Sequence, residues 1–152
     1  MIASQATSTE HYKKLVNILG KTNVKSKIET PFDFITIAKK GVKAEIIKNF
    51  KYYFDLTQED VAHLLNISEP TLYRWIKSNK PLDKNFSILL FELTDLFLFG
   101  ISVFESKENF SKWLNISNVA LGGYEPQEIL ELPGGISKIR DVLGRIEHGV
   151  FS

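Results

Sequence analysis

Thr57-Gln58-Glu59-Asp60-Val61-Ala62-His63-Leu64-Leu65-Asn66-Ile67-Ser68-Glu69-Pro70-Thr71-Leu72-Tyr73-Arg74-Trp75 carries the pattern of two short helices joined by a tight turn. Thr57 and Ser68 are residues that cap helix N-termini, and Pro70 suits the first turn of a helix. Asn66 tolerates the left-handed conformation that the turn needs, and the small Ala62 lets the two helices cross closely. Apolar residues fall at spacings that bury one face of both helices: Val61, Leu65, Ile67, Leu72 and Trp75. The stretch therefore predicts a helix-turn-helix rather than a plain helical hairpin.

The second helix of this unit is the candidate for DNA contact, because in helix-turn-helix units its N-terminal part enters the major groove. Arg74 can pair with a guanine edge, and Ser68, Tyr73 and Lys77 can hold phosphates, with Thr71 near the helix start. Glu69 opposes phosphate, and residues 55–104 hold four Lys/Arg against seven Asp/Glu. The alternative is a helical hairpin with the same core, in which Arg74 and Lys77 are simply solvated.

The remaining segments predict an all-α chain, because helical apolar spacing recurs and strand patterns are few. Residues 32–40 are short and apolar, and periodicity does not decide between helix and strand there. Gly122-Gly123 and Pro133-Gly134-Gly135 indicate tight loops. We expect helices over residues 10–20, 43–54, 84–99, 106–114, 126–130 and 136–148.

Composition narrows the classes of function. The 152 residues contain no cysteine, which removes disulfides, thiolate catalysis and cysteine-based metal sites, and the three histidines lie far apart. No catalytic constellation or phosphate loop is visible, so we expect no enzyme and no cofactor. The polar N-terminus lacks a signal-peptide core, and Glu92 and Asp95 interrupt the apolar run 86–104, so we expect a cytoplasmic protein without a membrane span.

Charge is uneven along the chain. Residues 1–54 hold ten Lys/Arg and four Asp/Glu, although the whole chain has a net charge of only +1. The basic N-terminal third could favour a polyanion. A solvated lysine-rich face is the alternative reading of the same residues.

The C-terminal end is unusually apolar. Chain termini are commonly polar and frayed, whereas this helical run stops at Gly149 and is followed by Val150-Phe151-Ser152. Such an end is either packed onto the protein itself or buried in something else.

From Gly41 to the end, the sequence resembles the Xre/MbcA/ParS family of antitoxins. The helix-turn-helix alone is generic, but its combination with a Leu-Gly-Gly loop and an Arg-Ile-Glu ending is specific. The matching motifs are Gly41-Val42, Leu56-Thr57, Thr71-Leu72-Tyr73-Arg74, Trp113-Leu114, Ala120-Leu121-Gly122-Gly123 with Pro126 and Leu130, and Leu143-Gly144-Arg145-Ile146-Glu147-His148-Gly149-Val150-Phe151.

The resemblance implies a homodimeric antitoxin that binds the operator of its own operon and neutralises a RES-type, NAD-degrading toxin. It implies a helix-turn-helix and dimerisation region over residues 41–104 and a toxin-binding domain over 105–152, in which the C-terminal end covers the toxin's active site. Residues 1–40 form an N-terminal extension of unknown role. The implied toxin-binding residues are Leu121, Gly122, Gly123, Arg145, Glu147, His148, Gly149, Val150 and Phe151.

Two positions depart from the family pattern. Trp75 stands where a second arginine is common, which removes one basic contact, and His148 stands where tyrosine is common, which could make toxin binding sensitive to pH. The same residues are compatible with two other functions. The chain could be a stand-alone transcriptional repressor, or an antitoxin whose helix-turn-helix serves only as a dimer interface.

Overall fold

The computed structural model describes the backbone of residues 2–149 and the side chains of residues 9–149. Over this range the chain forms α-helices and one 3-10 helix without a β-strand, which confirms the predicted all-α class. Extended backbone pairs only at an isolated bridge between Lys43 and Pro81. The chain divides into two compact units, Met1–Asp95 and Leu96–Ser152, and the division falls inside helix α6 (Lys84–Phe104).

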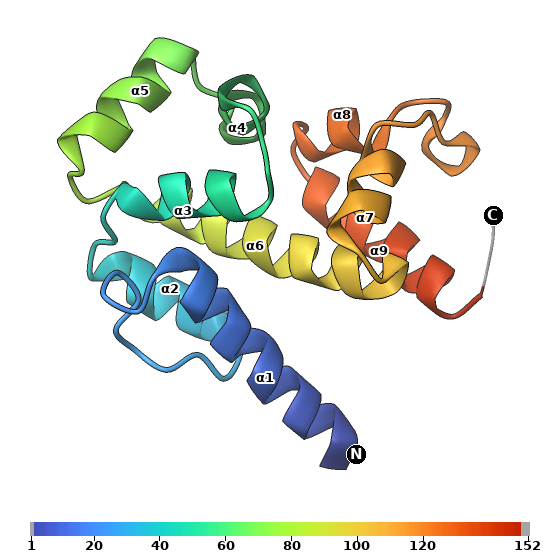
Figure 1. The fold of residues 1–152 in the computed structure, drawn as a ribbon, viewed down its shortest axis with the longest axis horizontal. Helices are drawn as coiled ribbons and strands as arrows, with labels where there is room; N and C mark the ends of the chain where they lie inside the picture. Colours follow the sequence, from blue (N-terminus) through green and yellow to red (C-terminus); the bar gives the residue numbers. More distant parts are fainter. Residues whose placement is uncertain (1, 150–152) are drawn as a thin grey trace. The chain divides into compact units, whose positions relative to one another are not determined.

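The N-terminal unit holds five helices and the first half of α6 (Figure 1). They are α1 (Ile2–Leu19), α2 (Phe32–Lys39), α3 (Glu45–Tyr53), α4 (Gln58–Leu65) and α5 (Glu69–Ser78). Helix α1 packs on α3, and α3 also contacts α4 and α5. The Phe34 ring stacks on Phe91 of α6 at 5.2 Å between centroids. The fully buried core side chains include Leu15, Leu19, Ile46, Ile47, Phe50, Leu72 and Leu90.

The N-terminal extension is part of this same unit. The His11 imidazole on α1 is hydrogen-bonded to the Asp95 carboxylate on α6, although the two residues lie far apart in the sequence. Leu15 and Leu19 then bury the next turns of α1. The extension therefore belongs to the body that carries the helix-turn-helix, while the domain boundaries expected at residues 40/41 and 104/105 remain predictions.

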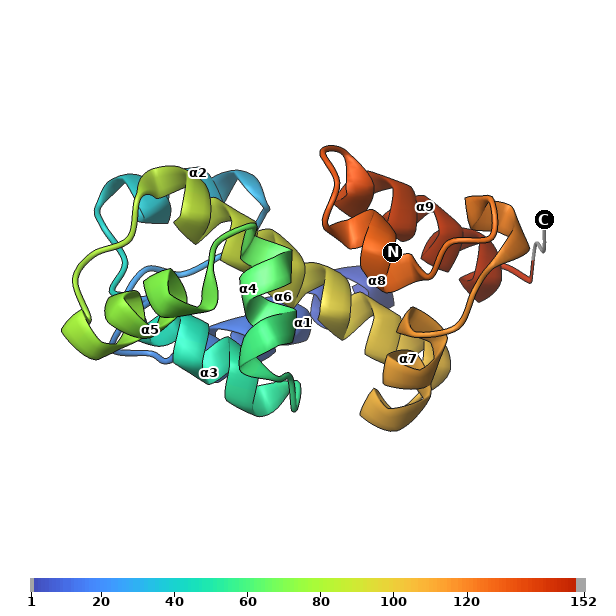
Figure 2. The ribbon, with the colours of Figure 1, turned by 90° about the horizontal axis from the view of Figure 1, so that it is seen from above.

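The C-terminal unit is built on the second half of α6 (Figure 2). Its other elements are α7 (Lys107–Leu114), the 3-10 helix η1 (Val119–Leu121), α8 (Pro126–Leu130) and α9 (Gly135–Glu147). Two glycines set its packing, since a Cβ on Gly100 would lie 2.2 Å from the Phe110 ring and one on Gly135 would lie 1.8 Å from the Ile129 carbonyl oxygen. An aromatic cluster surrounds the first contact and consists of Phe97, Phe104, Phe110 and Trp113.

Two helices differ from the sequence expectation, and a third decides a choice that the sequence left open. Helix α1 begins at Ile2 rather than near residue 10, and Ala3, Gln5 and Ala6 are residue types with good helix propensity. Residues 32–39 are helical, which settles the open choice. Helix α6 continues past residue 99 to Phe104, because the close approach of Phe110 offsets the weak helix propensity of Gly100.

Helix α6 is long and apolar enough to cross a membrane by length and composition alone. However, 56% of its most apolar window is buried inside the protein. Central helices of soluble proteins meet the same criterion, so this feature is weak support for a membrane span.

Candidate DNA-binding and toxin-binding sites

Thr57 and Ser68 cap the two helices of the helix-turn-helix, as the sequence predicts. The Asp60 N–H donates to Thr57 Oγ1 and the Thr57 N–H donates to an Asp60 carboxylate oxygen, both at 3.0 Å, which forms a capping box. Asn66 ends α4 in the left-handed conformation with φ of 55°. Ser68 Oγ then accepts the Thr71 N–H at 3.2 Å and starts α5. These caps fix the turn between the two helices.

Burial of the predicted helix-turn-helix core is incomplete at two of its five positions. Val61, Leu65 and Leu72 are buried as expected, while Ile67 and Trp75 remain half-buried. The Trp75 ring meets Phe86 of α6 edge-on at 4.8 Å. Trp75 therefore helps to hold α5 against α6 and offers no basic contact.

The outward face of α5 carries a hydrogen-bonded row of side chains. Thr71 Oγ1 accepts from the Ser68 hydroxyl at 2.9 Å and from the Arg74 guanidinium at 3.1 Å. The Lys77 ammonium lies 5.8 Å from the centroid of the Tyr73 ring, which is 58% exposed. All five predicted DNA-contact residues thus lie on or at the start of one helix. Arg74 is held along that helix, and its guanidinium has further N–H donors for an acceptor.

The charge of α5 changes sign along its length. Glu69 in the first turn suits the positive end of the helix but opposes a phosphate. Arg74, Lys77 and Lys80 give the second half and the following turn a positive face. Phosphate contact is therefore favoured toward the C-terminal half of α5.

In the C-terminal unit, the 118–124 loop is closed around Asn118. The Asn118 side chain accepts the Ala120 N–H at 2.8 Å, its carbonyl accepts the Gly123 N–H at 2.9 Å, and its own N–H donates to the Tyr124 carbonyl at 3.0 Å. Gly122 and Gly123 have φ of 68° and 86°, a region that side chains rarely adopt. The glycine pair therefore forms an exposed tip whose shape depends on having no side chain.

Leu121 differs from its two neighbours in the loop. It is only 6% exposed, so its side chain anchors the loop in the core of the C-terminal unit. Of the three loop residues in the predicted toxin-binding set, Gly122 and Gly123 are the ones that present surface.

Exposed apolar side chains surround this tip, and the sequence reasoning did not single them out. Val119 is 91% exposed, Ile116 60% and Tyr124 57%. A scattered apolar residue on a surface is ordinary, but three within nine positions of one loop indicate a contact surface. The sequence signal was available as apolar residues that flank a glycine pair in an otherwise polar segment.

Helix α9 is held by its middle and leaves its end exposed. Ile139, Val142 and Leu143 are buried, whereas Arg145, Glu147 and His148 are exposed. The helix stops at Gly149, which has φ of 73° as predicted for a left-handed stop. The predicted contacts Val150 and Phe151 lie outside the described residues.

In Figures 1 and 2, the orange segment between α7 and α8 and the red C-terminal end of α9 both lie toward the right of the C-terminal unit. The predicted toxin-binding residues are thus split between a loop and a helix end. Within residues 9–149 no group of three or more His, Asp or Glu side chains is arranged to hold a metal ion.

Comparison with known proteins separates the same two regions. A model of the antitoxin Xre-like helix-turn-helix domain matches residues 33–93, and one of the antitoxin Xre/MbcA/ParS C-terminal toxin-binding domain matches residues 100–149. The chain is also similar to the "Prs ADP-ribosylating antitoxin" of Sphingobium sp. (strain YBL2), with 28% identity over 132 residues that cover 81% of this chain and 83% of the relative. With an Xre-like helix-turn-helix followed by this toxin-binding domain, the chain belongs to the Xre/MbcA/ParS family of antitoxins.

Proposed function

We propose that this chain is the antitoxin of a type II toxin–antitoxin pair and neutralises a RES-type, NAD-degrading toxin. The end of α9 and the residues that follow it cover the toxin's active site, while α5 binds the operator of the antitoxin's own operon. The chain acts by binding rather than by catalysis, as a homodimer in the cytoplasm.

One observation carries the toxin-binding part of this proposal. Helix α9 is anchored by Ile139, Val142 and Leu143, and then presents Arg145, Glu147 and His148 at an end that nothing in its own unit buries. A rigid helix with an exposed polar end is suited to enter a cleft, because the partner supplies the burial. The exposed Val119, Gly122 and Gly123 of the 118–124 loop offer a second contact surface in the same unit.

The DNA-binding part rests on the face of α5. Ser68, Thr71 and Arg74 form a connected row, and Tyr73 and Lys77 lie beside it. A guanidinium held in position can pair with the two acceptors of a guanine in the major groove, while hydroxyl and ammonium groups hold phosphates. A helix-turn-helix that served only as a dimer interface would not require this face.

Co-purification of the tagged chain from its native cells tests the proposal. We expect a stoichiometric partner that consumes NAD after release from the antitoxin and is inactive while bound. Recovery of the chain alone, or with DNA only, would favour a stand-alone repressor and contradict the toxin-binding part.

A further inference from the structure

A basic hollow lies beside the loop that follows α1. It has a volume of about 380 Å³, and its lining includes Lys25, Lys40 and Lys43 together with the hydroxyl-bearing residues Thr22 and Ser26. These residues come from the loop between α1 and α2 and from the segment between α2 and α3. The fold thus brings Lys25 to the same hollow as Lys40 and Lys43, from which α2 separates it in the sequence.

These three lysines lack a carboxylate partner among the residues whose side chains are described. Glu45 is the one acidic residue in the lining of the hollow, so the three lysines leave the lining with a net positive charge. Ammonium groups around one hollow repel each other when no anion lies between them. The arrangement therefore favours an anion that accepts from lysines and hydroxyls.

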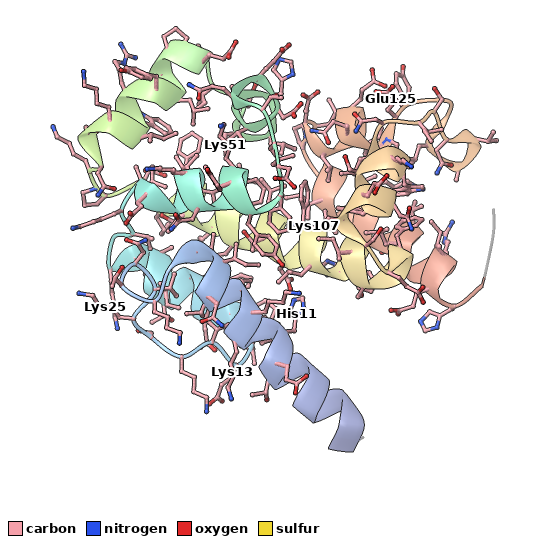
Figure 3. The ribbon with its side chains drawn as sticks, viewed as in Figure 1. His11, Lys13, Lys25, Lys51, Lys107 and Glu125 are labelled. Carbon is pink, nitrogen blue, oxygen red and sulfur yellow. The ribbon has the colours of Figure 1, made fainter. Side chains whose placement is uncertain are left out.

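The positive surface continues on the other side of the same loop. A second hollow of about 600 Å³ shares Lys25 and Ser26 with the first, and Lys13, Lys21 and Lys27 also line it. Lys27 is paired with Glu29 at 3.4 Å, so it contributes less net charge than the others. Figure 3 shows Lys13 on α1 and Lys25 on the following loop, both directed away from the body of the N-terminal unit.

The first hollow lies next to the C-terminal end of α5. Lys43 forms the isolated bridge with Pro81, the Ala44 N–H donates to the Lys80 carbonyl at 3.0 Å, and the Leu82 N–H donates to the Val42 carbonyl at 2.7 Å. These bonds fix the 42–44 segment beside the turn that follows α5. The basic half of α5 and the lysine hollow are thus neighbouring parts of one unit.

We propose that Lys25, Lys40 and Lys43, with Lys13 and Lys21 farther along the N-terminal unit, form a phosphate-binding surface that extends the DNA contact of α5 along the duplex backbone. This inference rests on the proposed DNA binding by α5. It gives the N-terminal extension a role, which is to add affinity that does not depend on base sequence. An acidic protein surface is the other class of partner for such lysines, but the neighbouring α5 face favours a nucleic acid.

The test compares two charge-matched triple variants of the full chain. One replaces Lys25, Lys40 and Lys43 with Gln, and the control replaces Lys107, Lys112 and Lys138 of the C-terminal unit with Gln. Fluorescence anisotropy would measure binding to a duplex from upstream of the protein's own operon and to a scrambled duplex, over a range of salt concentrations. We expect the first variant to bind both duplexes on the order of tenfold more weakly. The plot of log K against log salt concentration should also become less steep, with the magnitude of its slope reduced by about 2 to 3.

Separate outcomes would overturn the inference and the proposed function. If Arg74→Ala weakens operator binding while the lysine variant behaves like its control, the lysine surface is not a DNA contact and α5 still is. If the wild-type chain retains neither duplex, both proposals fail. A lysine variant that keeps its DNA affinity but loses self-association would instead assign the surface to an acidic protein face and overturn the inference.

Discussion

Helices α5 and α9 both present exposed polar side chains, but they do so in different ways. Helix α5 is fixed at its N-terminus by the Ser68 cap, buries Leu72, and presents its residues in a row along its length. Helix α9 starts at the tightly packed Gly135, is buried through its middle, and concentrates its exposed residues at its C-terminal end. A row suits a groove that runs beside the helix, whereas an end suits a cleft that receives it.

The largest expected effect comes from a variant that disturbs the packing of α9 against α8. In Gly135→Ala, the new methyl group would overlap the Ile129 carbonyl oxygen, so α8 and α9 must separate. We expect a loss of roughly 3 kcal/mol or more in the stability of the C-terminal unit. Chemical denaturation would measure it.

Gly144→Ala is the matched control on the same helix. A Cβ at Gly144 meets no atom within 4 Å, so we expect a gain of about 0.5–1 kcal/mol from the better helix former. Equal stabilities for the two variants would show that the close contact at Gly135 does not hold α9.

The next effect concerns the row on α5. Removing the guanidinium in Arg74→Ala should weaken operator binding by about 1–3 kcal/mol and reduce the preference over a scrambled duplex. Anisotropy titration with both duplexes would measure it. Arg145→Ala at the end of α9 serves as the matched arginine control and should leave operator affinity unchanged. If Arg74→Ala also changes nothing, the helix-turn-helix is a dimer interface.

A smaller effect tests the cap on which α5 depends. Ser68→Ala leaves the Thr71 N–H without its acceptor and should destabilise the N-terminal unit by about 1 kcal/mol. Ser78→Ala, at the other end of α5, removes only a long 3.3 Å bond to the Trp75 carbonyl and should have a weaker effect. Thermal unfolding of both variants would decide, and a larger loss for Ser78→Ala would contradict the role given to the cap.

The smallest expected effect is a pH dependence of stability that comes from Asp33 in α2, outside both α5 and α9. Hydrogen bonds from the Glu29 and Thr30 N–H groups hold the pKa of Asp33 below its usual value near 3.8. A lowered pKa in the folded state means that stabilisation is present above that usual value and is lost as pH falls through the lower, folded-state pKa. Asp33→Asn should remove this acid-dependent part of the stability. Unfolding measured at pH values from about 2 to 5, the range in which carboxylates usually titrate, would test this. An unchanged pH profile would contradict it.

The contrast between α5 and α9 also explains what the sequence predicted well. The caps at Thr57 and Ser68 and the left-handed Asn66 depend on neighbours within a few residues, so the pattern of the helix-turn-helix was sufficient to place them. The left-handed stop at Gly149 is equally local.

What the sequence did not show depends on contacts between distant residues. The Gly135 backbone approaches Ile129 of another helix, and Lys25 and Lys43 line one hollow only after the loop between α1 and α2 has packed beside the segment between α2 and α3. Leu121 was grouped with the exposed glycines, although folding turns its side chain inward and leaves Val119 outside. Local pattern cannot report which side of a loop faces the core.

The central claim is that the end of α9 binds the toxin and α5 binds the operator. Its most direct test uses two variants and two assays. One variant lacks residues 147–152, which leaves Ile139, Val142 and Leu143 in place, and the other is Arg74→Ala. Each would be assayed for protection of cells that express the toxin, read as cellular NAD, and for operator affinity. We predict that the truncated chain loses protection and keeps operator affinity, and that Arg74→Ala does the reverse. Full protection by the truncated chain would contradict the account.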